Sequence, residues 1–307
     1  MKEILQKAYE YGSQYFEYGI LADYIPELAK EDKTKAAITL IDKDGNIFNY
    51  GDTDYRFSMQ SVVKVVLYLC VLEHYEFEDI KAYVGVKPSA KPFNSILELE
   101  LSNKNIPVNP FINAGAIVSA YLIYKQYGDR AFEVILNKLR DLTGNPELNY
   151  SEKIFNSEKS TAYANRALTY MMLSSDILPD FMDVDAVLDT YFKSCSVMIN
   201  SEELAKLSSV LSNDGVKVGN GERKINSNHA RILRTIMATC GTYDYSGEFA
   251  IKIGIPAKSG VGGGIVTASK HGLGLAVYCP GLDTHGNSYV GTRMLEYVSN
   301  ALDLNIY

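Results

Sequence analysis

Strand-forming segments stand near both ends of this 307-residue chain, and a long helical stretch separates them. Residues 36–41 are a run typical of a buried strand, apolar except for one threonine, and an Asp-Gly turn joins them to a returning strand at 46–50. Glycine-punctuated strands come back at 264–268 and 273–278. The pattern predicts an α/β (α+β) fold in which one antiparallel sheet is flanked by helices and carries a helical insertion.

Helical periodicity dominates the middle of the chain. We expect helices there at 61–75, 113–127, 131–142, 160–173, 184–192 and 201–211, and an asparagine cap followed by Glu203 opens the last of them. Further helices are expected at 3–18, 230–238 and 292–302. The chain is therefore predicted to be a single unit over 1–307, with a sheet-containing subdomain at 1–60 and 226–307 and a mainly helical subdomain at 61–225.

Composition and charge argue against several kinds of partner. Because 30 Lys and Arg stand against 37 Asp and Glu, the formal net charge is -7 and the overall field repels nucleic-acid phosphates. The apolar runs are too short to span a bilayer and the N-terminus lacks a signal-peptide core, so we expect a cytoplasmic protein that binds neither nucleic acid nor membrane. The four cysteines form no CxxC pair, which indicates reduced core residues, and the four histidines lack metal-ligand spacing, so no metal is expected.

The first candidate for chemistry is a Ser-x-x-Lys motif, Ser61 to Lys64, at the start of an apolar helix. Three residues apart on a helix, the two side chains share a face, so the amine can reach the hydroxyl. The surrounding valines favour burial, which lowers the pKa of a lysine toward the neutral form that a general base needs. A serine nucleophile at a helix N-terminus also gains from the amide dipoles. The same spacing is also typical of an ordinary helix cap followed by a surface lysine.

The second candidate is Lys258-Ser259-Gly260, followed by a run of further glycines. Alone it is typical of a glycine-rich bend beside a surface lysine. In penicillin-recognising enzymes, however, Lys-Ser/Thr-Gly on a strand is the partner of Ser-x-x-Lys, because the lysine supplies positive charge and the glycine lets substrate approach the backbone. The two motifs in this order, one on a helix and one on a strand, favour a serine-lysine acyl transferase.

Longer segments extend this likeness: the chain resembles the short-form bacterial glutaminases, which share the fold of serine β-lactamases and penicillin-binding proteins. The blocks that carry the resemblance stand in family order at 22–28, 60–64, 110–117, 157–160, 165–166, 191–196, 240–249 and 254–261. They are distributed over nearly the whole chain, from residue 22 to residue 261.

The resemblance implies hydrolysis of L-glutamine to L-glutamate and ammonia through a γ-glutamyl ester, without a cofactor, in a homo-oligomer that is a dimer or tetramer. It implies Ser61 as nucleophile, Lys64 as base, and Tyr243 or Tyr191 as proton relay. Backbone N–H groups of Ser61 and Val261 would form the oxyanion hole. The implied substrate contacts are Tyr24, Ser61, Asn113, Glu158, Asn165, Tyr191, Tyr243 and Val261.

The chemistry of those residue types agrees with the implied roles. Glu158 is the one carboxylate in the set and suits the ammonium group of an amino acid, while Asn113 and Asn165 can donate to its carboxylate. Glu158 and Asn165, seven residues apart, share a face if that stretch is one helix. Outside the family context they are also typical of a surface glutamate and of helix-capping asparagines.

Two other functions stay open at this point. A β-lactamase or penicillin-binding peptidase uses the same scaffold, but the chain has no Ser-Asp-Asn motif in its helical region. A catalytically silent amino-acid sensor would keep the pocket without turnover. The intact Ser61, Lys64 and Lys258 favour an enzyme over a sensor.

Overall fold

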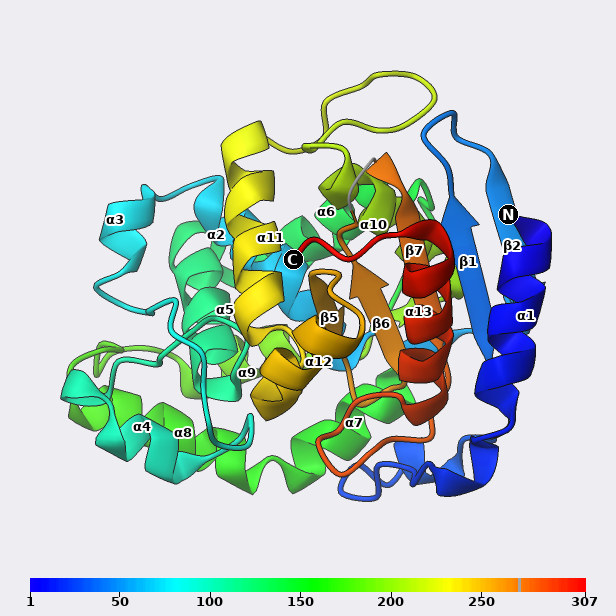
Figure 1. Ribbon diagram of the computed structural model, residues 1–307. Coiled ribbons are helices and arrows are strands. Elements are labelled where there is room, and N and C mark those ends of the chain that lie inside the picture. Colours follow the sequence, from blue (N-terminus) through cyan, green and yellow to red (C-terminus); the bar gives the residue numbers. More distant parts are fainter. Residues whose placement is uncertain (270–271) are drawn as a thin grey trace.

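The computed structural model describes residues 1–269 and 272–307, and it is built around a five-stranded sheet in the order β2-β1-β7-β6-β5 (Figure 1). The strands are β1 (Ala37–Ile41), β2 (Ile47–Gly51), β5 (Ala257–Ser259), β6 (Gly264–Thr267) and β7 (Gly274–Tyr278). All neighbouring pairs are antiparallel, and β1 lies between β2 and β7. The predicted joining of the N-terminal hairpin to the C-terminal strands is therefore confirmed.

Helices cover both faces of this sheet. Helices α1 (Lys2–Ser13) and α13 (Tyr289–Leu302) pack together on one face, and α10 (Ser201–Ser212) packs on the other (Figure 1). In β1, Ile38 and Leu40 belong to the apolar cluster beneath α1 and α13, whereas Ala37 and Ile41 belong to the cluster beneath α10. A strand buried on both faces has no exposed position, which explains why β1 is apolar except at Thr39, whose hydroxyl forms hydrogen bonds with Asn49 and Ser201.

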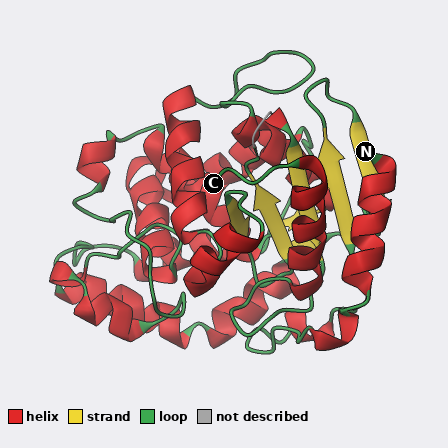
Figure 2. Ribbon diagram, in the orientation of Figure 1, coloured by secondary structure: helices red, strands yellow, loops and turns green. Residues whose placement is uncertain are grey.

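Most of the remaining helices lie beside the sheet, to the left of the yellow strands in Figure 2. The remaining helices are α2 (Lys64–Leu72), α3 (Phe77–Ile80), α4 (Ile96–Leu101), α5 (Asn113–Tyr127), α6 (Ala131–Thr143), α7 (Glu152–Thr161), α8 (Tyr163–Ser174), α9 (Val184–Cys195), α11 (Ser227–Cys240) and α12 (Ser246–Lys252). Every residue of α2 is buried, because α5, α6 and α11 surround it. In the described part of the chain, no helix has both the length and the apolar character needed to cross a membrane. The division into two subdomains stays a prediction.

Local side-chain hydrogen bonds explain where two expected helices differ. The helix expected at 160–173 is wrong: α7 ends at Thr161 and α8 begins at Tyr163, with Ala162 between them. The hydroxyls of Ser160 and Thr161 both donate to the carbonyl oxygen of Ser157, which competes with helix continuation. The N-terminal helix ends at Ser13 and a short 3-10 turn follows it, so the expected span to residue 18 is too long.

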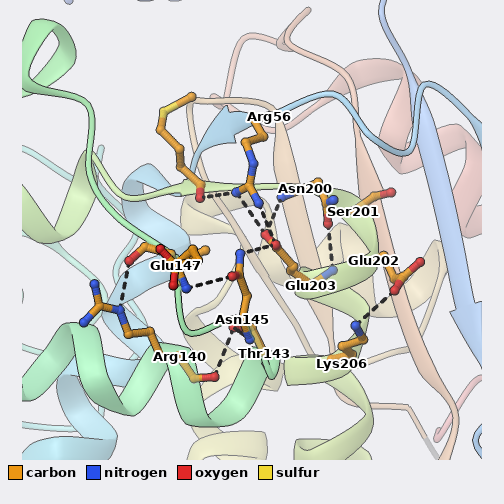
Figure 3. Close-up of polar contacts among 12 residues, drawn as sticks. Arg56, Arg140, Thr143, Asn145, Glu147, Asn200, Ser201, Glu202, Glu203 and Lys206 are labelled. Atoms are coloured by element: carbon orange, nitrogen blue, oxygen red, sulfur yellow. Dashed lines mark hydrogen bonds and ion pairs between the residues drawn. The ribbon is translucent and has the colours of Figure 1, made fainter.

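A polar cluster ties a small second sheet to α10 (Figure 3). The sheet consists of β3 (Phe57–Ser58) and β4 (Met198–Ile199), which sequence analysis missed because each has only two residues. Glu203 accepts hydrogen bonds from Arg56 at 2.7 Å, Asn145 at 2.6 Å and the backbone N–H of Asn200 at 3.1 Å. This confirms the expected helix cap and fixes β3, which leads directly into the Ser-x-x-Lys motif.

Candidate active site

The candidate nucleophile lies in a strained turn at the start of α2. Ser61 belongs to the 3-10 turn Gln60–Val63 and is buried, while Gln60 just before it has a φ of 45°. The N–H of Met59 donates to Val197, and the N–H of Val62 donates to Met59, so hydrogen bonds hold the turn on both sides. A non-glycine residue in the left-handed region carries a conformational cost, and such residues cluster at functional sites. The turn therefore directs Ser61 at the expense of local backbone stability.

Lys64 is fully buried one turn away, as the sequence predicted. Its Nζ donates to the carbonyl oxygen of Phe111 at 3.0 Å and to Oδ1 of Asn113 at 2.7 Å. Among the described residues no hydrogen bond joins Nζ to the Ser61 hydroxyl, so the expected direct contact is not made. Burial lowers the pKa of Lys64 to about 8, and the nearby Cys195 and Glu158 offset part of that shift. Burial therefore makes the neutral amine much easier to reach near neutral pH than it is for an exposed lysine.

The Ser61 hydroxyl interacts instead with the hydroxyl of Tyr243. Tyr243 has a φ of 62°, and its hydroxyl also donates to the carbonyl oxygen of Ser259 at 3.3 Å. Two residues before Tyr243, Gly241 lets the backbone lie directly against β5, because a Cβ there would stand 1.6 Å from the carbonyl oxygen of Ala257. Burial raises the pKa of Tyr243 to about 12, so the phenol is protonated at neutral pH, although the contacts with Ser61 and Ser259 oppose that shift.

Tyr191, the second candidate relay, has different partners. It lies on α9, is buried, and donates to Oδ1 of Asn113 at 3.4 Å. Its hydroxyl also interacts with the thiol of Cys195, one helical turn along α9. Asn113 Oδ1 therefore accepts hydrogen bonds from both Lys64 and Tyr191. No hydrogen bond between Tyr191 and Ser61 occurs within residues 1–269 and 272–307.

Glu158 and Asn165 both reach this region, but from two helices. Glu158 is near the end of α7 and Asn165 near the start of α8, so the expectation that one helix face carries them is wrong. Asn165 Oδ1 accepts from Nδ2 of Asn113 at 2.9 Å. Burial raises the pKa of Glu158 to about 8, with Gln60 and Lys64 opposing the shift. Neither Glu158 Oε2 nor Gln60 Nε2 makes a hydrogen bond of 3.5 Å or less in the described part of the chain, although the Gln60 side chain is close enough to Glu158 to lower its pKa.

One pocket brings most of these side chains together. Its space, including its mouth, is about 510 Å³, and the sequence-predicted residues that line it are Tyr24, Ser61, Asn113, Glu158, Asn165 and Tyr191. Tyr24 stands at the rim, with 48% of its surface exposed. Tyr243 and Val261 line an adjoining groove, which Tyr24 and Phe93 also border. The two hollows therefore meet at Tyr24 and Phe93.

The second lysine motif lies against the nucleophile turn. Lys258 and Ser259 are on β5, and Gly260 ends the strand. A Cβ at Gly260 would be 2.7 Å from the carbonyl oxygen of Met59 and 3.2 Å from the N–H nitrogen of Val62. Only a glycine lets the two backbones approach this closely. The two motifs that the sequence paired are thus in contact.

Sequence reasoning missed other residues that line the pocket, among them Gln60, Phe93 and Cys195. Two of them had a signal in the sequence. Gln60 directly precedes the candidate nucleophile, and Cys195 is four residues after Tyr191, which is the spacing of one helix face. Phe93 had none, because it lies in an irregular segment before α4 and packs on the Tyr243 ring with centroids 4.8 Å apart.

Known proteins match this chain over its full length. The glutaminase family profile matches residues 19–307. The chain is 43% identical to Glutaminase 2 of Clostridium perfringens and 42% identical to the glutaminase of Clostridium tetani, with all of each chain covered in both cases. A solved structure of a probable glutaminase, ybaS, superposes with a TM-score of 0.92 at 32% identity and covers 100% of this chain and 99% of its own. The probable glutaminase of Bacillus subtilis complexed with 6-diazo-5-oxo-L-norleucine has a TM-score of 0.90 at 28% identity, with 100% and 97% covered.

The sheet with its helical insertion is the serine β-lactamase-like fold shared with these structures, so the predicted fold class is confirmed. Within that class of enzymes, the chain belongs to the glutaminase family. The resemblance noted from the sequence blocks is confirmed as well.

Proposed function

We propose that this chain hydrolyses L-glutamine to L-glutamate and ammonia, with Ser61 as nucleophile and a γ-glutamyl ester as intermediate. As a member of the glutaminase family it is an amidohydrolase acting on glutamine. The observation that carries the proposal for this site is the buried carboxyl group of Glu158, which lines the same pocket as Ser61 and whose Oε2 lacks a partner among the described residues. A buried acceptor of this kind suits a cationic substrate group.

The pocket offers complementary groups for both charged ends of an amino acid. An α-ammonium group beside Glu158 would favour the ionised carboxyl, because an opposite charge lowers its pKa. Asn113 donates to Oδ1 of Asn165, which leaves the N–H groups of Asn165 available to the α-carboxylate. Tyr24 and Tyr191 are the further proposed contacts from the pocket wall.

In the proposed chemical step, Ser61 Oγ attacks the side-chain carbonyl carbon and ammonia leaves, after which water hydrolyses the ester. Lys64 is the proposed base, since its pKa of about 8 supports proton uptake near neutral pH. Its amine has to turn from Asn113 toward Ser61 to do so. The N–H groups of Ser61 and Val261 are the proposed oxyanion donors, and the N–H of Val261 has no backbone acceptor among the described residues.

For the proton that ammonia needs, the contacts favour Tyr243 over Tyr191. The Tyr243 hydroxyl interacts with Ser61, whereas the Tyr191 hydroxyl donates to Asn113. A general acid must stand within hydrogen-bond reach of the reacting atoms. Tyr243 is therefore the proposed relay: it gives its proton to the leaving ammonia and regains one from Lys64, which has taken the proton of Ser61. Tyr191 is the proposed substrate contact.

The test is release of ammonia and glutamate from L-glutamine by the purified protein, beside Ser61→Ala and with L-asparagine and a chromogenic β-lactam as alternative substrates. Ser227→Ala, an exposed serine in α11, is the matched control. We expect glutamine turnover that Ser61→Ala abolishes and Ser227→Ala keeps. Turnover that survives in Ser61→Ala would refute the nucleophile. Binding of glutamine without any turnover by the unmutated protein would favour the sensor function.

The predicted homo-oligomer, a dimer or tetramer, is also a proposal. Its support is a set of exposed apolar side chains on α4 and α8, two helices that contact each other (Figure 1): Ile96, Leu97, Leu101, Tyr163 and Tyr170. Light scattering measures the mass in solution, and Leu101→Asp is expected to lower it if this surface joins two copies. The four unpaired, buried cysteines support the predicted cytoplasmic location, which cell fractionation tests.

A further inference from the structure

The reaction proposed above assigns no role to the buried amine of Lys258. This amine lies next to Tyr243. Lys258 Nζ lies 4.3 Å from the centroid of the Tyr243 ring and 5.9 Å from that of Phe111. It donates to the carbonyl oxygen of Ser259 at 2.5 Å. The Tyr243 hydroxyl donates to the same oxygen at 3.3 Å. One buried backbone oxygen is thus shared by the amine and the phenol.

Sharing this acceptor affects how firmly the phenol is held. A carbonyl oxygen has two lone pairs, so it can accept both hydrogen bonds. At 3.3 Å the phenol bond is longer than the ordinary O–H···O distance of about 2.7–2.8 Å. The Tyr243 hydroxyl therefore keeps its interaction with Ser61 and makes only a long hydrogen bond to Ser259. Because the amine makes the shorter of the two bonds, we expect that without it the phenol would shorten its own bond to the Ser259 oxygen and move away from Ser61.

The surroundings of Lys258 favour an uncharged donor. The side chain is fully buried, and burial, followed by the charge of Lys64, holds the pKa of Lys258 well below its usual range. A neutral amine keeps its N–H donors and avoids the desolvation cost of a buried cation. Lys258 is thus suited to hold a hydrogen bond at this place.

We propose that Lys258 is a positioning residue for Tyr243: by sharing the Ser259 carbonyl oxygen and lying against the phenol ring, it holds the Tyr243 hydroxyl against Ser61. This inference rests on the proposed role of Tyr243 in proton transfer. Since Lys258 acts through Tyr243 on a step after substrate binding, its loss lowers kcat and leaves KM nearly unchanged.

A double-mutant cycle tests the coupling. Lys258→Met removes the N–H donors but keeps an unbranched side chain of similar length. We expect kcat to fall about tenfold, with KM within about twofold of the unmutated value. In the Tyr243→Phe background the same substitution is expected to cause no further loss, because the positioned hydroxyl is already absent. In the Tyr191→Phe background, the matched control, the two losses are expected to multiply.

Each outcome decides between roles. If Tyr243→Phe alone leaves kcat unchanged, the proposed function of Tyr243 fails. If Tyr243→Phe lowers kcat and the losses multiply with those of Lys258→Met, only the positioning role of Lys258 is wrong. Thermal melting shows whether each variant folds, and Lys258→Leu, which also removes the N–H donors, enters the same cycle if Lys258→Met does not fold. If neither variant folds, Lys258 is a structural residue and the inference is overturned.

Discussion

The two ends of the segment 60–72 are equally buried but follow opposite rules. From Val65 to Leu72 the side chains are apolar or aromatic, and the helix α2 pairs the backbone groups. From Gln60 to Lys64 the chain carries a positive φ, a buried amide nitrogen without a partner among the described residues, and a buried amine. One end follows the ordinary rules of a protein core, and the other departs from them.

The difference teaches how this fold supports a reactive site. Each large apolar side chain buried in α2 contributes about 1.5–3 kcal/mol to stability. A buried polar group without a partner costs about 1–3 kcal/mol, and a strained backbone position costs a similar amount. The apolar body of α2 thus offsets the cost of the turn that directs Ser61. The following predictions test whether the apolar part of α2 stabilises the fold while the turn before it serves the reaction.

The largest effect is expected from Glu158→Gln, which removes a buried carboxyl group of α7 that interacts with Gln60 at the start of the segment. Loss of a buried charge partner for the substrate ammonium should lower kcat/KM about 10³-fold. The pKa of Glu158 is raised from 4.5 to about 8, so the folded state binds its proton more tightly and Glu158 destabilises the fold increasingly between those pH values. The melting temperature of Glu158→Gln should therefore exceed that of the unmutated protein at pH 8 and approach it at pH 5.

The matched control is Glu152→Gln, an exposed glutamate at the start of the same helix, which should change neither kinetics nor melting appreciably. A Glu158→Gln protein with unmutated kcat/KM, or one that melts lower at pH 8, would contradict the prediction.

Leu67→Ala tests the apolar part of the segment, Val65 to Leu72. The side chain is fully buried in α2, and its truncation should destabilise the fold by about 2–5 kcal/mol. Urea unfolding measures the change, while kcat/KM at 25 °C should stay within about twofold because the turn at Ser61 is untouched. Ile251→Ala in α12 is the control, since that side chain is 82% exposed. A large loss of kcat/KM in folded Leu67→Ala would show that the two regions are not separable.

The pH dependence of kcat/KM sharpens the comparison further. The proposed active forms are the Glu158 carboxylate and the neutral Lys64 amine, and both groups have a pKa of about 8. Both active forms are the deprotonated ones, so well below pH 8 kcat/KM should rise by about a hundredfold per pH unit, the slope for loss of two protons, and it should level off above pH 8. Because the two groups are close, the apparent pKa values of the rising part of this profile belong to the pair rather than to either residue alone. Melting curves in the same buffers exclude unfolding, and a kcat/KM that falls over this range would refute the proposed protonation states.

The smallest effect is expected from a polar group within the apolar part of α2. Tyr68 is fully buried in α2, and its hydroxyl has no hydrogen-bond partner in the described part of the chain. Tyr68→Phe removes that group and should stabilise the protein by about 1 kcal/mol, with unchanged kinetics. Urea unfolding measures it beside Tyr18→Phe, an exposed tyrosine for which we expect no change. A less stable Tyr68→Phe would mean that the hydroxyl is hydrogen-bonded in solution.

Much of the fold was predictable because its signals are local. The apolar run of β1, the Asp-Gly turn after it and the helix at 113–127 all follow from side-chain periodicity and turn chemistry. The break at Ala162 was not predictable from periodicity, since it depends on hydroxyls that bond back to Ser157. The two-residue strands β3 and β4 were missed because they exist only through their pairing with each other.

By itself, the sequence determined the antiparallel sheet built from both ends of the chain, the family, and the pairing of the Ser61–Lys64 motif with the Lys258 motif. These follow from periodicity and from motif order, which are properties of neighbouring residues. Only the tertiary structure decided that Lys64 bonds to Asn113 rather than Ser61, that Tyr243 rather than Tyr191 meets Ser61, and that Glu158 is buried with an oxygen unpartnered among the described residues. Those contacts join segments far apart in the chain, so their geometry and burial arise only when the sheet and the helices pack together.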